Sequence, residues 1–105
     1  MKRSYAVVFE RSPNNYAAYA PDVPGCIATA STWDEMQVMI REALAFHFQG
    51  LAEKGEPIPE PGMSLCEAMA YHSAELLAAG EGDQAVETTF GMVDVEFEAP
   101  APTPA

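Results

Sequence analysis

Two histidines, two cysteines and sixteen acidic residues are the side chains of this 105-residue chain that could do chemistry. Cys26 follows a predicted turn and is the first candidate nucleophile. A catalytic thiol, however, needs a neighbouring base or positive charge to become a thiolate, and the local sequence supplies neither. Cys66 lies in a predicted helix, and the two cysteines lack the spacing of metal ligands. In a reducing compartment we expect both to be free thiols.

The carboxylates offer a second possibility, a two-metal nuclease site, which needs acidic groups gathered at strand ends and the adjoining helix. Glu10, Asp22 and Asp34 are the candidates, but each has a local explanation in a strand, a turn or a helix cap. His47 and His72 sit on or beside the apolar stripes of predicted helices, with no acid in metal-binding spacing. We therefore expect no catalytic residue, no metal and no cofactor, with enzyme activity kept only as a minor alternative.

Charge is distributed unevenly along the chain. The net charge is −11, and no basic residue follows Lys54, whereas ten of the sixteen acids do. A nucleic-acid-binding protein normally carries a basic stripe, so direct nucleic-acid binding is not expected. The excess of acid indicates either a solvated surface or a surface complementary to a basic protein. The residues predicted to contact such a partner lie in the second half of the chain: Glu87, Asp94, Glu96 and Glu98.

The elements that would position these residues begin with three short strands. Residues 5–11 alternate between two faces, residues 16–20 alternate in the same way, and residues 26–31 form a third strand. Val23-Pro24-Gly25-Cys26 suits a type II turn, because proline fits its second position and glycine its third, where φ is positive.

Two helices and a further strand are predicted after these. Thr32 and Glu35 form a capping box before an apolar stripe that includes Trp33, Phe46 and Phe48, with Gly50 and Gly55 as candidate ends. A proline-rich connector over residues 56–61 precedes a second helix over 64–79, with Leu65, Met69 and His72 on its stripe. Residues 88–97 alternate as a fourth strand, and the Pro/Ala-rich residues 99–105 are expected to be disordered.

The segments 5–10, 16–26, 31–36 and 51–61 carry a family resemblance. Pro21-Asp22-Val23-Pro24-Gly25-Cys26, placed between those strands and before that helix, is its most specific part. Over about residues 3–61 the chain resembles the N-terminal domain of HicB-type antitoxins. The resemblance implies an α+β fold: a partial, degenerate ribonuclease H-like arrangement of a three-stranded antiparallel sheet with a packed helix. A second helix and a fourth strand would complete one domain over residues 1–98.

The resemblance also implies a function. Members of this family lack nuclease activity and bind a small, basic, messenger-RNA-cleaving toxin of the HicA type, whose active site they cover. They usually form dimers or tetramers, so a homodimer or homotetramer is expected. Many carry a C-terminal DNA-binding region, but residues after 61 show no helix-turn-helix pair and no basic ribbon.

A different class of function stays open beside this one, a stand-alone oligomeric binding or regulatory module with no toxin partner. The chain lacks an apolar run of the roughly 20 residues that span a bilayer, and its start lacks the apolar core of an export signal. We therefore expect a cytoplasmic protein without membrane association.

Overall fold

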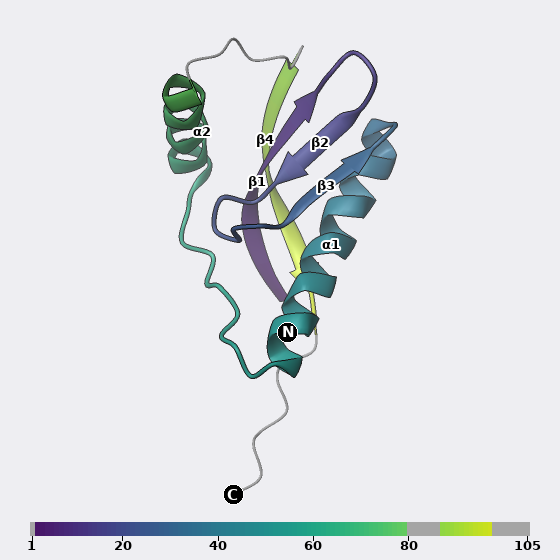
Figure 1. Cartoon of the computed structure of the whole chain (residues 1–105), viewed down its shortest axis with the longest axis vertical. Coiled ribbons are helices and arrows are strands. Elements are labelled where there is room, and N and C mark those ends of the chain that lie inside the picture. Colours follow the sequence, from purple (N-terminus) through teal and green to yellow (C-terminus); the bar gives the residue numbers. More distant parts are fainter. Residues whose placement is uncertain (1, 80–86, 98–105) are drawn as a thin grey trace, which may run out of the picture.

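The computed structural model describes residues 2–79 and 87–97, which form four strands and two helices (Figure 1). Within these residues, neither helix is both long and apolar enough to cross a membrane. The elements follow one another as β1 (Lys2–Arg11), β2 (Tyr16–Tyr19), β3 (Ile27–Ala30), α1 (Trp33–Glu53), α2 (Leu65–Ala79) and β4 (Glu87–Glu96).

The strands form one antiparallel sheet in the order β3-β2-β1-β4. The predicted antiparallel sheet is present, and it has four strands instead of three, because the predicted fourth strand pairs with β1. All of β1 pairs with β4, from Lys2 opposite Glu96 to Arg11 opposite Glu87. The strand β2 covers only the second half of β1, and β4 supplies partners along the whole of the other edge. The open edges of the sheet are therefore those of β3 and β4.

One face of the sheet packs against α1. Tyr5, Val7 and Phe9 of β1 are buried there with a helical stripe of four residues, Met36, Ile40, Leu44 and Phe48. The ring centroids of Tyr5 and Phe48 lie 5.2 Å apart, a usual separation for a packed aromatic pair. Phe46 was predicted to widen this stripe, but its side chain is 79% exposed because it lies on the outer side of α1.

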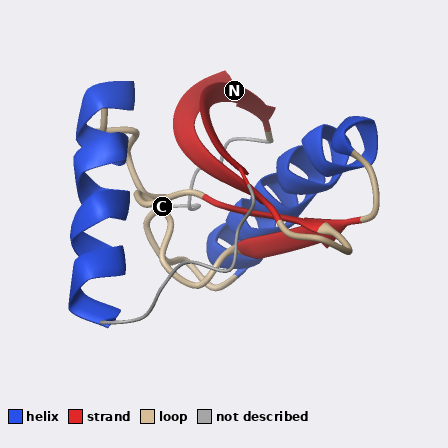
Figure 2. Ribbon diagram, turned by 90° about the horizontal axis from the view of Figure 1, so that it is seen from above, coloured by secondary structure: helices blue, strands red, loops and turns tan. Residues whose placement is uncertain are grey.

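The other face of the sheet is covered by α2, so the two helices lie on opposite sides of it (Figure 2). Beneath α2, Ala6 and Val8 of β1 are fully buried. Among the α2 side chains that the structure describes, residues 65–75, Ala68 and His72 are buried, four residues apart. Leu65 and Met69, which the predicted stripe placed with His72, are exposed instead, because they lie off the face that meets the sheet.

Four polar contacts join the connector between the helices to β1 and to the turn between β2 and β3. The Tyr5 hydroxyl donates to the carbonyl of Pro59 at 2.5 Å. Arg3 pairs with Glu60 at 3.4 Å. One Asp22 carboxylate oxygen, Oδ2, accepts the backbone N–H groups of residues 62 and 63, just before α2. These contacts determine where α2 starts relative to the sheet.

Candidate partner-binding groove

A groove runs between α1 and the open edge of β4. The helix α1 crosses the sheet obliquely and packs more extensively on β3 than on β4, so the β4 side of this face stays partly uncovered (Figure 1). Three adjoining hollows follow one another along it, and neighbouring hollows share lining residues. We call this feature the α1–β4 groove. It combines a sheet edge with side chains of both charge signs, as partner-binding surfaces often do.

Aromatic side chains line the first hollow, at the N-terminal end of α1. It encloses about 190 Å³ and is lined by Phe9, Arg11, Tyr16, Trp33, Glu87 and Thr89. Arg11 lies opposite Tyr16 on one side and Glu87 on the other, so these three form one row across the sheet. The first turn of α1 places Trp33 beside this row, where its ring centroid lies 4.9 Å from that of Phe9 and 6.1 Å from that of Tyr16.

The next two hollows extend along β4. The second encloses about 290 Å³, and Gly91 lies in it next to Phe9. A Cβ atom added at Gly91 would meet the Phe9 ring at 3.6 Å, so the absence of a side chain keeps this part open. The third encloses about 550 Å³ and is mostly charged, with six lining residues: Lys2, Arg41, Glu42, Ala45, Asp94 and Glu96. The groove thus passes from an aromatic end to a charged end.

Three of the four residues predicted to contact a partner line this groove. Glu87 lies at its aromatic end, and Asp94 and Glu96 lie at its charged end. Glu98 lies outside the described residues. No measurement of partner contact bears on any of the four, so their role stays a prediction.

Two carboxylates of the groove already face cations of the same chain. Glu87 pairs with Arg11 at 3.9 Å, and Asp94 pairs with Lys2 at 3.6 Å. The Ser4 hydroxyl donates to Asp94, and this hydrogen bond, followed by the charge of Lys2, lowers the pKa of that carboxyl. Because these ion pairs are exposed, each contributes little to stability and exchanges readily for a better partner.

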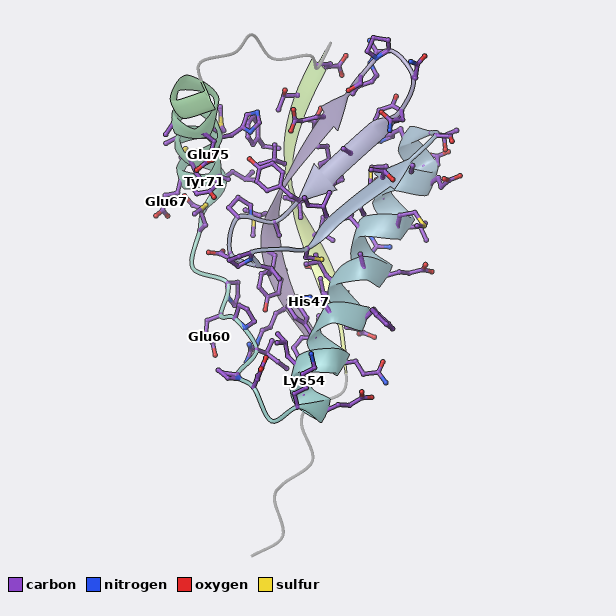
Figure 3. The ribbon with its side chains drawn as sticks, in the orientation of Figure 1. His47, Lys54, Glu60, Glu67, Tyr71 and Glu75 are labelled. Atoms are coloured by element: carbon purple, nitrogen blue, oxygen red, sulfur yellow. The ribbon has the colours of Figure 1, made fainter. Side chains whose placement is uncertain are left out.

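A second acidic surface lies on α2, whose sequence contains no lysine or arginine. Glu67, Tyr71 and Glu75 follow one another at four-residue spacing along this helix (Figure 3). The exposed apolar side chains of Leu65 and Met69 lie on the same helix. Excess acid in the second half of the chain indicated such a surface. The sequence did not show which α2 residues remain exposed, because that depends on how the helix meets the sheet.

Three of the residues considered for catalysis, Cys26, Asp22 and Asp34, occupy positions that the fold explains. Cys26 is buried, and burial raises the pKa of its thiol, which disfavours the thiolate. Asp22 binds backbone N–H groups, and Asp34 lies in the first turn of α1. Across residues 2–79 and 87–97, no three histidine, cysteine, aspartate or glutamate side chains gather as a metal site.

The histidines occupy structural positions as well. His72 of α2 is buried, and its Nδ1 atom lies 2.8 Å from the Tyr19 hydroxyl oxygen. Its ring also packs edge-on against Phe90. His47 is half-buried beside Phe48 on α1.

Comparison with known proteins identifies the family. The protein-family model described as "HicB_like antitoxin of bacterial toxin-antitoxin system" matches residues 5–99. The chain therefore belongs to the HicB-like antitoxins. The match reaches well beyond residue 61, where the resemblance in sequence motifs ended. It includes α2 and β4, and all the residues that line the α1–β4 groove except Lys2.

Solved structures share the fold. The "HicA3 and HicB3 toxin-antitoxin complex" contains a chain 21% identical, with a TM-score of 0.61, covering 92% of this chain and 100% of that one. The N-terminal domain of Burkholderia pseudomallei antitoxin HicB is 21% identical at a TM-score of 0.62, over 90% of this chain and 99% of that one. A toxin-antitoxin complex from Streptococcus pneumoniae gives 18% identity and a TM-score of 0.69, over 100% and 79%. At these identities the likeness concerns the fold.

One curated relative is more similar in sequence but only in part. It is a 14.9 kDa protein from the rep-hol intergenic region of Haemophilus phage HP1, strain HP1c1, 34% identical over 56 residues. That alignment covers 53% of this chain and 42% of the phage protein, so less than half of the relative is matched.

Proposed function

We propose that this protein is an antitoxin that binds a small, basic, messenger-RNA-cleaving toxin and blocks its active site, without enzymatic activity of its own. The observation that carries the proposal is the family match over residues 5–99 in a chain whose net charge is −11. A toxin that binds RNA needs a cationic surface to contact phosphates. An acidic protein attracts that surface and competes with RNA for it.

Electrostatic attraction of this kind acts mainly on the association rate. Complementary charges raise association rate constants above the ordinary range of about 10⁵–10⁶ M⁻¹s⁻¹, and salt removes much of the gain. The exposed carboxylates of α2 have no basic residue on the same helix, and the ion pairs that Glu87 and Asp94 of β4 make with Arg11 and Lys2 are exposed and weak. Both surfaces are therefore available to a cationic protein.

We also infer that the antitoxin assembles as a homodimer or homotetramer. The strands β3 and β4 each present an open edge, with unpaired backbone groups that a neighbouring strand would satisfy. Exposed apolar side chains lie near both edges, Ile27 on β3 and Met92 on β4. The alternative of a stand-alone oligomeric module rests on the same edges and needs no toxin.

A pull-down from native lysate distinguishes the two functions. Tagged protein is captured at low salt, washed with rising salt, and the eluate is identified by mass spectrometry. The antitoxin proposal expects a small basic protein that is retained at low salt, shed at high salt, and cleaves RNA once released. Light scattering on the same preparation gives the mass of the assembly. A homo-oligomer that retains no such protein would favour the stand-alone module, and a monomeric mass at micromolar concentration would refute the oligomer.

A further inference from the structure

The aromatic end of the α1–β4 groove has the composition of a cation-binding pocket. Phe9, only 5% exposed, forms the floor of this hollow, and the rings of Trp33 and Tyr16 stand beside it. Glu87 adds a carboxylate at the rim. Trp33 keeps 37% of its surface exposed, so a ligand has access to the indole ring.

Aromatic faces and a carboxylate attract cations for different reasons, and here they act on the same space. The negative face of an aromatic ring attracts a cation lying within about 6 Å of its centre, and indole does so most strongly. A carboxylate adds charge-assisted hydrogen bonds, which for a guanidinium are frequently bidentate. A planar guanidinium stacks on an indole while its edge bonds to an acid, which a compact ammonium does less well.

We propose that this pocket receives an arginine side chain of the basic toxin, stacked on Trp33 and hydrogen-bonded to Glu87. The assignment rests on the proposed antitoxin function, because that function supplies the partner as a cationic protein. Tryptophan and arginine are the residue types that most often dominate binding energy at protein interfaces. The pocket would then anchor the toxin at one end of the groove, and the carboxylates at the other end would add general attraction.

In the unbound state the protein's own Arg11 pairs with the Glu87 carboxylate that the incoming arginine would bind. Its guanidinium approaches Glu87 to 3.9 Å, the side chains being 46% and 65% exposed. An exposed ion pair at this separation is weak, so a stacked arginine displaces it. Binding is thus an exchange of partners on Glu87, and removal of Arg11 should strengthen it. This expectation separates a specific pocket from a merely acidic surface.

Trp33 is the only tryptophan of the chain, so its fluorescence reports on the pocket directly. The probe is N-acetyl-arginine amide, titrated at constant ionic strength, with the neutral isostere N-acetyl-citrulline amide as control. We expect a saturable change in Trp33 fluorescence with the arginine probe and at least about fivefold weaker binding of the citrulline probe. Equal responses to both probes, or none to either, would overturn the pocket.

Charge-matched variants test the mechanism. Glu87→Gln should weaken arginine-probe binding about five- to tenfold, whereas Asp94→Asn, which removes one acid from the same strand, should change it less than about twofold. Arg11→Gln should strengthen binding severalfold, and Lys2→Gln on the same strand should not. If the two acid variants changed probe binding equally, or the two base variants did, binding would depend on net charge alone. That result would overturn the contacts assigned to Glu87 and Arg11.

The affinity of the same acid variants for the toxin is then measured. Glu87→Gln should weaken the complex about tenfold more than Asp94→Asn does. A toxin that binds the wild-type protein and both variants equally would overturn the pocket but leave the antitoxin function standing. A protein that binds the arginine probe but no RNA-cleaving toxin would instead overturn the proposed function, and with it the identity of the arginine donor.

Discussion

The carboxylate of Asp22 accepts a hydrogen bond from the backbone N–H of Met63 at 3.0 Å, across 41 positions of the chain. The same oxygen accepts the N–H of Gly62 at 3.1 Å. One residue of the turn between β2 and β3 therefore fixes the chain just before α2. Asp22, which was considered as a possible metal ligand, thus has a structural role: it joins the N-terminal sheet to the second helix.

Replacing Asp22 should loosen that junction. Asp22→Ala removes an acceptor shared by two backbone donors and should lower the free energy of unfolding by about 1–2 kcal/mol, whereas Asp22→Asn keeps an acceptor oxygen and should cost less. Urea denaturation measures the difference. Hydrogen exchange at Met63 and in the first turn of α2 should accelerate in Asp22→Ala. Unchanged exchange there would contradict the role given to Asp22.

Stability should fall at alkaline pH because of a half-buried tyrosine. Burial, followed by the nearby charges of Glu10, Tyr71 and Glu75, raises the pKa of Tyr19 from 10.0 to about 12. Between these values the unfolded chain loses the phenolic proton and the folded chain keeps it. Stability is therefore complete below pH 10 and falls as the pH rises towards 12. Tyr5, whose pKa burial also raises, acts in the same direction.

The variant Tyr19→Phe isolates this contribution. It cannot ionise at position 19, so its urea midpoint should fall less between pH 10 and 12 than that of the wild type. At pH 7 it should be less stable by about 1–2 kcal/mol, because the buried His72 loses its hydrogen-bond partner. An alkaline slope equal to that of the wild type would refute the assignment to Tyr19.

Two phenylalanines of α1 form a matched pair for testing the core. Phe48 is fully buried between Tyr5 and Phe97, whereas Phe46, two residues away, is 79% exposed. Phe48→Ala should cost about 3–5 kcal/mol through lost burial and a residual cavity. Phe46→Ala should stay within about 0.5 kcal/mol of the wild type. Chemical denaturation of both variants is the measurement, and similar costs would contradict the orientation of α1.

The two cysteines should react at different rates. Cys66 is exposed, whereas Cys26 is buried and burial raises the pKa of its thiol. At pH 8 a thiol reagent such as dithiobisnitrobenzoate should modify Cys66 quickly, and Cys26 only when the protein opens. Cys26→Ser should keep the fast phase, and Cys66→Ser should lose it. A fast phase from Cys26 would indicate an activated thiol and reopen the enzyme alternative.

Local chemistry made several parts of the fold predictable. Thr32 and Ser64 cap their helices, and each accepts the backbone N–H of the glutamate three residues on, as the capping-box pattern predicts. Gly25 has a φ of 86°, which the predicted type II turn requires. Gly55, with a φ of 73°, follows the end of α1, whereas Gly50 lies inside the helix. These features depend on residues close in sequence.

Features that depend on distant residues were harder to predict. The alternation of β1 indicated one well-buried face, but both faces are buried, because α2 returns over Ala6 and Val8. No periodicity shows which element covers a strand. The contact between Tyr16 and Trp33 was not predicted for the same reason, because it joins a strand to a helix. Their convergence depends on the angle at which α1 crosses the sheet.

The most direct test of the central claim is the rate of RNA cleavage by the cognate basic toxin as this protein is titrated against it. The proposal predicts that cleavage falls in proportion to added protein and stops near stoichiometric amounts, at low salt with wild-type protein. Heat-denatured protein serves as the control and should leave cleavage unchanged. Cleavage that continues at full rate in a several-fold excess of folded protein would contradict the antitoxin function.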